Sequence, residues 1–244
     1  MLRFDGRVAL VTGATRGLGL AIARRLHAGG CTVALNYAHA DDDAERAVKE
    51  LGDGAPVYAV KGDATLDWQP IADEVLGRHG HLDILVHNTS SWRPMSAARA
   101  DLPVLHEDVA SGIDPLLRAV PLLRAAMGDG GRIVAVSSSG SQTVIPGYVS
   151  LGVAKAALES LVRYLAVELA RDGIAVNAVS TAKLDKGPDT PRLDMVRALA
   201  ARTPAGRLTQ PDDVAAAVAL LCTPEAAWIQ GQILTVDGGL SLCT

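Results

Sequence analysis

The chain has 244 residues, of which 49% are hydrophobic and 20% charged, with 24 glycines and a single phenylalanine. Ala, Val and Leu therefore supply most of the apolar content, as in a globular α/β domain with a buried parallel sheet. The net charge of -4 offers no electrostatic footprint for nucleic acid or for an anionic membrane surface, so we expect neither as a partner.

Cysteine usage and the N-terminal stretch indicate the compartment. Cys31, Cys222 and Cys243 are widely separated, which argues against a disulfide framework or a structural zinc site and fits a reducing cytosol. The first residues run straight into a strand pattern without a secretory signal, and no segment approaches the roughly 18 apolar residues of a membrane span. We expect a cytoplasmic protein. We expect no metal site, because His79 and His81 lack metal-ligand spacing.

Seven short apolar runs bounded by turn residues recur along the chain, at residues 7–13, 31–37, 56–63, 82–88, 131–139, 174–180 and 233–239. Between most of them lie segments with helical periodicity that end at glycine, such as 17–30, 41–52 and 156–173. This alternation predicts an α/β fold: a Rossmann-like doubly wound parallel sheet of about seven strands with helices on both faces. We expect a single domain over residues 1–244.

The least regular stretch, residues 181–207, follows the sixth apolar run and contains three prolines and mixed charge. It has the pattern of a mobile loop with a short helix. Since it follows the carboxyl end of a strand, we expect it to form a substrate lid.

A glycine-rich turn, TGATRGLG at residues 12–19, joins the first apolar run to an amphipathic helix. Glycine permits the tight turn and a close backbone approach to a pyrophosphate, whose charge the helix N-terminus meets. The turn predicts a dinucleotide site with contacts from Gly13, Thr15, Arg16, Gly17, Leu18 and Gly19.

The second strand indicates which dinucleotide binds. An acidic residue at its end would bind the ribose diol and repel a 2′-phosphate, but here the strand ends in Asn36 and Tyr37. Arg16 and His39 are placed to contact a 2′-phosphate beside Tyr37. The acidic run 41–43 fits the first turn of the next helix. We therefore favour NADPH over NADH.

Six motifs, in order and over essentially the whole chain, resemble the short-chain dehydrogenase/reductase family: TGATRGLG, the triplet 62–64, Asn88, Ser138, Lys155 and VDGG at 236–239. The resemblance implies a nicotinamide cofactor. It also implies that Asp63 and its neighbour Ala64 lie at the adenine, that Asn88 supports the strand beside the cofactor, and that Lys155 holds the nicotinamide ribose hydroxyls.

The active-site pattern departs from that family. The usual proton-donating Tyr, four residues before the Lys, is replaced by Leu151. No Asn occurs between Asn88 and Asn177, so the usual relay Asn is missing, and its segment offers only Asp108, Ser111 and Asp114. The common N-N-A-G motif reads HNTS at residues 87–90. Ordinary ketone or alcohol chemistry is therefore in question.

Tyr148, seven residues before Lys155, has two interpretations. It is either an incidental aromatic in a family member with impaired catalysis, or the replacement for the absent Tyr, because seven residues is close to two helical turns. The dipeptide Pro146-Gly147 places Tyr148 near the first helical turn, so this facing is approximate.

The spacing Tyr-x6-Lys, the GVAK that contains Lys155 and the later TPAGR at 203–207 resemble the NADPH-dependent enoyl-acyl-carrier-protein reductases. The resemblance implies reduction of the C2=C3 bond of an enoyl thioester on acyl-carrier protein or CoA, in fatty-acid or polyketide-type metabolism. Tyr148 would stabilise the thioester oxygen, with Ser138 as a second oxyanion ligand and Lys155 as the ribose clamp. It further implies a homo-oligomer, commonly a tetramer, that packs through residues 157–170.

Three alternatives remain open: an atypical short-chain carbonyl reductase, a non-redox isomerase or cyclase, and a nucleotide-binding protein without turnover. Trp92 and Met95, in the loop after the fourth apolar run, either line an acyl pocket or cap the core. We interpret His87 as a packed rather than a catalytic histidine.

Overall fold

The computed structural model describes residues 2–128, 130–187, 190 and 193–243. Within these residues one all-parallel sheet has the strand order β3-β2-β1-β4-β5-β6-β7. Its strands are β1 Val8–Thr12, β2 Thr32–Tyr37, β3 Val57–Lys61, β4 Ile84–His87, β5 Arg132–Ser138, β6 Ala175–Thr181 and β7 Ile233–Val236. Each of the seven apolar runs is a strand, so the predicted Rossmann-like sheet is confirmed.

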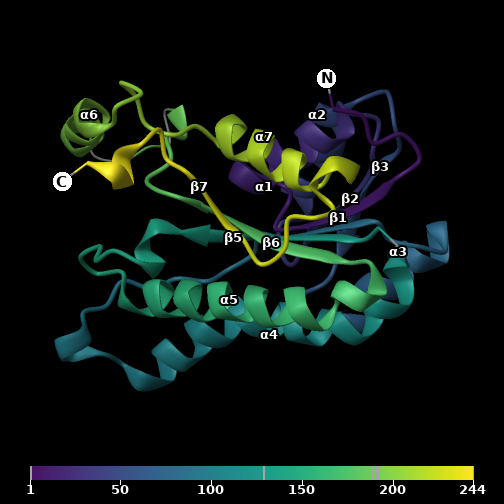
Figure 1. Cartoon of the computed structure of the whole chain (residues 1–244), viewed down its shortest axis with the longest axis horizontal. Helices are drawn as coiled ribbons and strands as arrows, with labels where there is room; N and C mark the ends of the chain where they lie inside the picture. The colour runs from purple at the N-terminus through teal and green to yellow at the C-terminus, as the bar shows by residue number, and fades with distance from the viewer. Residues whose placement is uncertain (1, 129, 188–189, 191–192, 244) are drawn as a thin grey trace.

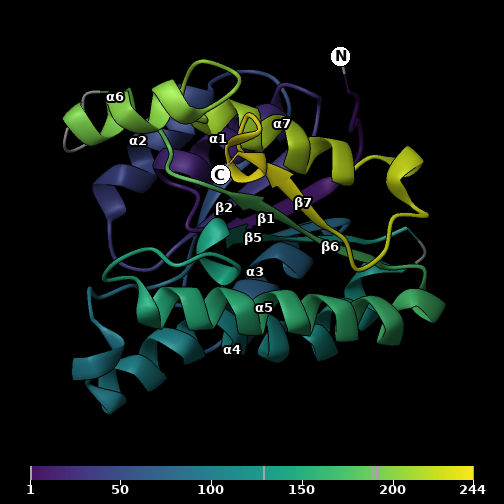
Figure 2. The ribbon, with the colours of Figure 1, turned by 60° about the vertical axis from the view of Figure 1, so that its left-hand side comes forward.

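Helices cover both faces of the sheet (Figures 1 and 2). The α-helices are α1 Gly17–His27, α2 Asp41–Leu51, α3 Gln69–His79, α4 Leu102–Met127, α5 Val149–Glu168, α6 Leu193–Arg202 and α7 Pro211–Leu221. Short 3₁₀ turns are η1 Ala97–Arg99, η2 Ser139–Ser141, η3 Ala170–Asp172, η5 Pro224–Ala226 and η6 Leu240–Leu242. Helices α1, α2 and α7 lie on one face, and α3, α4 and α5 lie on the other.

Two apolar cores result because successive side chains of a strand point to opposite faces. In β1, Ala9 and Val11 belong to the core under α1 and α7, whereas Val8 and Leu10 belong to the core over α4 and α5. Burying a side chain such as Leu10, which is 1% exposed, contributes about 1.5–3 kcal/mol. Burial on both faces explains why the strands read as continuous apolar runs.

The strand order reverses direction between β1 and β4. In open α/β sheets this switch point opens a crevice at the carboxyl ends of the strands, where ligands bind. The loops after β1 and β4 meet there, and the start of α5 and helix α6 lie at the same end of the molecule (Figure 1).

The predicted short helix within residues 181–207 is α6. The segment is tied at its start, because Leu184 bridges Thr209 and the Asp185 N–H donates to the Thr209 carbonyl at 2.8 Å. Positions 188–189 and 191–192 of the predicted lid lie outside the described residues, and a lid function remains a prediction. None of the helices in the described residues is long and apolar enough to span a membrane.

Candidate active site

The glycine-rich turn after β1 forms a cradle for an anion. Gly13 and Gly17 have positive φ angles of 60° and 55°, which glycine adopts without strain. A side chain at Gly19 would collide with the Gly13 carbonyl and lie 2.9 Å from Asn88 Nδ2. Helix α1 starts at Gly17 with no acidic residue in its first turn, so its free N–H groups suit a pyrophosphate.

Thr12 and Asn88 join the ends of β1 and β4 at the switch point. The Thr12 hydroxyl oxygen accepts the N–H groups of Asn88 at 2.9 Å and Thr89 at 3.0 Å. The Asn88 amide donates to the carbonyls of Thr12 at 3.0 Å and Gly13 at 3.3 Å. Asn88 therefore holds the glycine turn against β4.

Two buried hydroxyls at this edge are unsatisfied. In the described residues, the Oγ1 atoms of Thr89 and Thr181 have no hydrogen-bond partner, although buried polar groups are nearly always paired. Thr89 follows β4 beside Gly13, and Thr181 ends β6. Together with the glycine cradle, these orphaned hydroxyls fit the polar groups of a nicotinamide dinucleotide.

The other residues predicted in the glycine turn and after β3 lie at the same edge. Thr15 is half-buried, and Leu18 packs against the core under α1. The Asp63 carboxylate accepts from Thr65 N at 2.9 Å and Thr65 Oγ1 at 2.6 Å, which closes a local turn. Ala64 is 3% exposed and its side chain belongs to the core over α4, so only its backbone is available to a ligand.

The region at the end of β2 contains one buried side chain, Asn36, and several exposed polar side chains. Asn36 is buried and its amide donates to carbonyls of the neighbouring β3 region. The Asp41 carboxylate accepts from Tyr37 OH at 2.8 Å and from Lys61 Nζ at 2.8 Å. Arg16 and His39 are exposed. Asp41 does begin α2, as predicted for the acidic run, and its charge is paired with Lys61.

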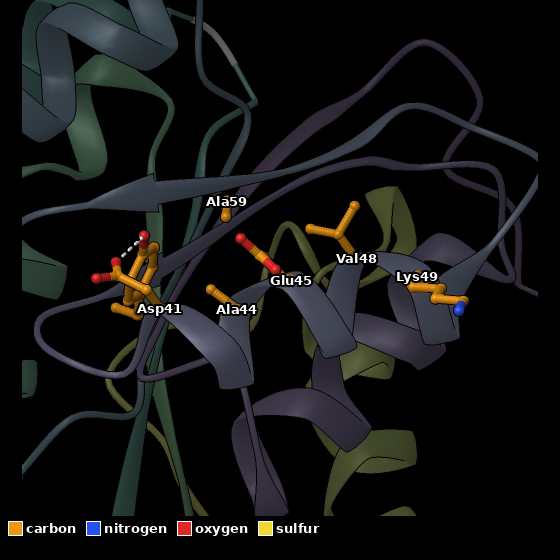
Figure 3. Close-up of a pocket in the computed structure, with 7 residues that line it drawn as sticks. Asp41, Ala44, Glu45, Val48, Lys49 and Ala59 are labelled. Atoms are coloured by element: carbon orange, nitrogen blue, oxygen red, sulfur yellow. Dashed lines mark hydrogen bonds between the residues drawn. The ribbon is translucent and has the colours of Figure 1, made fainter.

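A cavity of about 470 Å³ lies beside these groups, between α2 and the β2–β3 edge of the sheet (Figure 3). Its lining residues are Tyr37, Asp41, Ala44, Glu45, Val48, Lys49 and Ala59. Of the predicted site residues it includes only Tyr37. Thr89 and the glycine cradle are at the switch point, and Thr181 ends β6 at the same edge of the sheet, so we place the candidate active site there and not in this cavity.

Tyr148 is the residue immediately before α5, with φ -109° and ψ 17°, and Gly147 precedes it with φ +76°. The seven-residue spacing from Tyr148 to Lys155 is therefore not wholly within α5. The Tyr148 hydroxyl donates to Ser138 Oγ at 3.3 Å. Its ring lies over Gly140, where a Cβ would be 2.6 Å from the ring, and 5.6 Å from the centre of the Trp92 ring.

The phenol of the Tyr148–Ser138 pair is a protonated hydrogen-bond donor. Burial raises the pKa of the Tyr148 phenol, and the hydrogen bond to Ser138 offsets this only in part, so the phenol stays protonated at neutral pH. Ser138 ends β5, and its Oγ also accepts the Gly140 N–H at 3.2 Å. Trp92 is 47% exposed and lies beside Tyr148, so it does not cap the core.

Lys155 is almost fully buried, with 4% of its surface exposed, and its Nζ donates to the Val136 carbonyl of β5 at 2.7 Å. Burial lowers the pKa of Lys155 to about 8, against the opposing effect of Glu159. Glu159, one helical turn later, accepts from Ser137 Oγ and Ser141 Oγ at 2.6 Å each. The amine thus contacts the sheet, and its role as a ribose clamp remains a prediction.

His87 is a packed histidine, as interpreted from the sequence. It is 0% exposed, and its Nε2 lies 3.1 Å from the Gly112 carbonyl of α4. Burial and the nearby charge of Lys155 lower the pKa of His87 to about 4. The imidazole is therefore neutral across the physiological range.

Asp108, Ser111 and Asp114 are the polar residues of the segment in which the relay Asn is missing, and the sequence predicts no role for them. In the structure Asp108 is 0% exposed and binds Arg93, whereas Asp114 is at the surface and pairs with Arg118. A carboxylate in a helical pattern carries no signal of this burial, because its partner comes from a loop.

Comparisons with known proteins show the family to which the chain belongs. Residues 13–241 match the family described as Enoyl-(Acyl carrier protein) reductase. The chain belongs to the short-chain dehydrogenase/reductase family of oxidoreductases, whose members bind NAD or NADP.

Individual relatives cover almost the whole chain. A 1-cyclohexenylcarbonyl-CoA reductase of Streptomyces collinus is 36% identical, over 97% of this chain and 87% of the relative. A hydroxynaphthalene reductase-like protein of Metarhizium brunneum is 32% identical, over 96% and 94%. A solved short-chain dehydrogenase from Burkholderia cenocepacia in complex with NADP has a TM-score of 0.89 and 33% identity, over 98% and 99%.

The lowered pKa of His87 predicts a pH-dependent stability. Its folded pKa of about 4 lies below the unfolded value of about 6.5, so the unfolded chain binds the proton first. This contribution to stability is complete above about pH 6.5 and is lost as the pH falls to about 4, by about 3 kcal/mol. We expect His87→Asn to remove this part of the acid sensitivity in denaturant unfolding measured from pH 7 to 4. Parallel pH profiles for the wild type and the variant would contradict it.

Proposed function

We propose that this chain is an NADPH-dependent reductase of the C2=C3 double bond of an enoyl thioester, carried on acyl-carrier protein or CoA in fatty-acid or polyketide-type metabolism. The observation that carries the proposal is the 3.3 Å contact of the Tyr148 hydroxyl with Ser138 Oγ, made although position 151 holds leucine. The family match and the CoA reductase of Streptomyces collinus support it.

The position of the phenol suits this reaction. In carbonyl reduction the proton donor must reach the oxygen beside the carbon that takes the hydride. In enoyl-thioester reduction the hydride goes to C3, and negative charge appears on the thioester oxygen two carbons away. A donor placed before the helix, and not one turn into it, suits the displaced oxygen.

Bound NADPH supplies the hydride. Gly13, Gly17 and the first turn of α1 would hold its pyrophosphate, and Thr89 and Thr181 offer unsatisfied hydroxyls to its polar groups. With substrate bound, the Tyr148 hydroxyl would turn from Ser138 Oγ to the thioester oxygen, and together with the Ser138 hydroxyl it would stabilise the enolate, as oxyanion-hole donors do. The raised pKa of Tyr148 keeps this donor protonated. A proton from solvent at C2 completes the reduction.

The proposal includes NADPH as the preferred cofactor. No acidic side chain ends β2, where Tyr37 lies, and the nearby Asp41 carboxylate is neutralised by Lys61 at 2.8 Å. Exposed Arg16 precedes α1 beside the glycine turn. A 2′-phosphate would therefore meet positive charge from Arg16, and the Asp41 carboxylate that accepts from Tyr37 is already paired with Lys61.

We further propose that residues 181–207 close over the acyl chain and that the protein is a homo-oligomer, a tetramer as the family resemblance implies. Apolar side chains exposed on α5, such as Tyr164 at 67% and Val167 at 77%, support packing against a second copy. Isolated exposed apolar groups are common, but a row on one helix is typical of an interface.

The first test is the Tyr148→Phe variant with crotonyl-CoA and longer enoyl thioesters, followed by NADPH absorbance. We expect kcat to fall about 100-fold, the usual effect of removing an oxyanion-hole donor, while NADPH binding is unchanged. Tyr58→Phe, whose hydroxyl on β3 lies 3.0 Å from His79 Nε2, is the matched control and should behave as wild type. Full activity of Tyr148→Phe would refute the proposed role.

The cofactor preference is tested by Arg16→Gln. Loss of a charge-assisted hydrogen bond to the 2′-phosphate should raise the KM for NADPH about tenfold and leave the KM for NADH unchanged. Arg25→Gln, in the last turn of α1 and so about two turns or more from the glycine turn, is the control. Equal changes in the KM for NADPH and in the KM for NADH would mean that Arg16 does not bind the 2′-phosphate.

A further inference from the structure

Tyr148 is held by a neighbouring loop as well as by its own helix. The Met95 N–H donates to the Gly147 carbonyl at 3.0 Å, and Met95 forms a parallel bridge with Tyr148. The Trp92 ring lies 5.6 Å from the Tyr148 ring, tilted by 48°. Residues 91–95, which follow β4 and are called loop 91–95 below, therefore set the place of Tyr148.

Loop 91–95 is anchored to α4 by the carboxylate of Asp108, whose side chain is 0% exposed. Oδ1 accepts from Arg93 Nη2 at 2.9 Å, Arg93 Nε at 3.1 Å and Ser91 Oγ at 3.0 Å. Oδ2 accepts the Arg93 backbone N–H at 3.0 Å. One buried carboxylate thus fixes both the side chain and the backbone of the loop.

The same network reaches the first turn of α5. Ser111 Oγ donates to the Asp108 carbonyl at 2.8 Å and accepts the Ser91 N–H at 3.1 Å. Ser150 Oγ donates to the Arg93 carbonyl at 3.2 Å. The loop is therefore connected to the segment around Tyr148 by Ser150 and Met95 in addition to the ring contact.

Asp108 is charged in this setting. Burial opposes its ionisation, but the hydrogen bonds that the carboxylate accepts from Arg93 and Ser91 outweigh burial and hold the pKa of the carboxyl below its usual range. Arg93 is 45% exposed and also pairs with Glu107 at 2.8 Å. Two guanidinium nitrogens of Arg93 donate to one oxygen of Asp108, which fixes their geometry, and losing Arg93 would leave the buried Asp108 charge unmatched.

We propose that Asp108 is a positioning residue, which through Arg93 and loop 91–95 holds the Tyr148 phenol where it meets the substrate oxygen. This inference rests on the proposed function, since it assumes that Tyr148 is the oxyanion donor. The helix that carries Asp108 contains no asparagine. In place of an asparagine, α4 therefore contributes a carboxylate that acts on the site through loop 91–95.

Asp108→Asn tests the positioning without turnover. The protein has four tyrosines, so labelling with 3-fluorotyrosine gives four ¹⁹F resonances, and Tyr148→Phe identifies that of Tyr148. We expect Asp108→Asn to shift and broaden the Tyr148 resonance and to leave those of Tyr37, Tyr58 and Tyr164 unchanged. An unchanged Tyr148 resonance overturns the proposal, whatever the substrate.

Kinetics with crotonyl-CoA test the consequence. Displacing a donor from outside the site lowers kcat by about 10- to 100-fold, and the dissociation constant of NADPH should not change. Because Asp108 acts through Tyr148, Asp108→Asn should lower kcat no further in the Tyr148→Phe background. Losses that multiply in the double variant would overturn the proposal, since Asp108 would then act by another route.

Two further variants complete the design. Asp114→Asn, on the same helix but 38% exposed beside Arg118, should leave resonance and kcat as in wild type. Arg93→Lys keeps the charge, loses the fork and should reproduce the Asp108→Asn effects from a partly exposed position. If the wild type reduces no enoyl thioester, the proposed function fails, and the ¹⁹F experiment alone still decides the positioning.

Discussion

The junction between the carboxyl ends of β1 and β4 is the constraint on which the site depends. Thr12 and Asn88 bind each other across the point where the strand order reverses. The same Asn88 amide approaches the glycine turn so closely that Gly19 tolerates no side chain. The glycine turn and the ends of β1 and β4 are therefore joined directly by hydrogen bonds.

Tyr148, the proposed oxyanion donor, is positioned differently from a tyrosine within the helix. Tyr148 lies immediately before α5, and its ring packs over Gly140 and beside the Trp92 ring, both outside the helix. The Tyr148 hydroxyl thus donates to Ser138 Oγ, although Leu151, 8% exposed, occupies the position of the usual donor. A displaced donor in an otherwise ordinary short-chain dehydrogenase/reductase scaffold is what changes the reacting bond in the proposed function.

Local patterns predicted the sheet and the glycine turn, because strands buried on both faces are continuous apolar runs. The Pro146-Gly147 dipeptide likewise indicated that Tyr148 lies near the helix start. Other features depend on distant contacts. Pro115 lies inside α4, where proline usually breaks a helix, and packing against α5 overrides that preference. The Asp108–Arg93 pair and the contact of the Lys155 amine with β5 have no periodic signal, because each joins two separate elements.

The most direct test of the central claim is the destination of the hydride. Crotonyl-CoA would be reduced with NADPH deuterated at C4 of the nicotinamide, in parallel with acetoacetyl-CoA, and the products analysed by mass spectrometry and NMR. A donor aligned with the thioester oxygen predicts butyryl-CoA with deuterium at C3 and no turnover of the ketone. Deuterium only in 3-hydroxybutyryl-CoA would contradict it and identify Tyr148 as the acid of a carbonyl reductase.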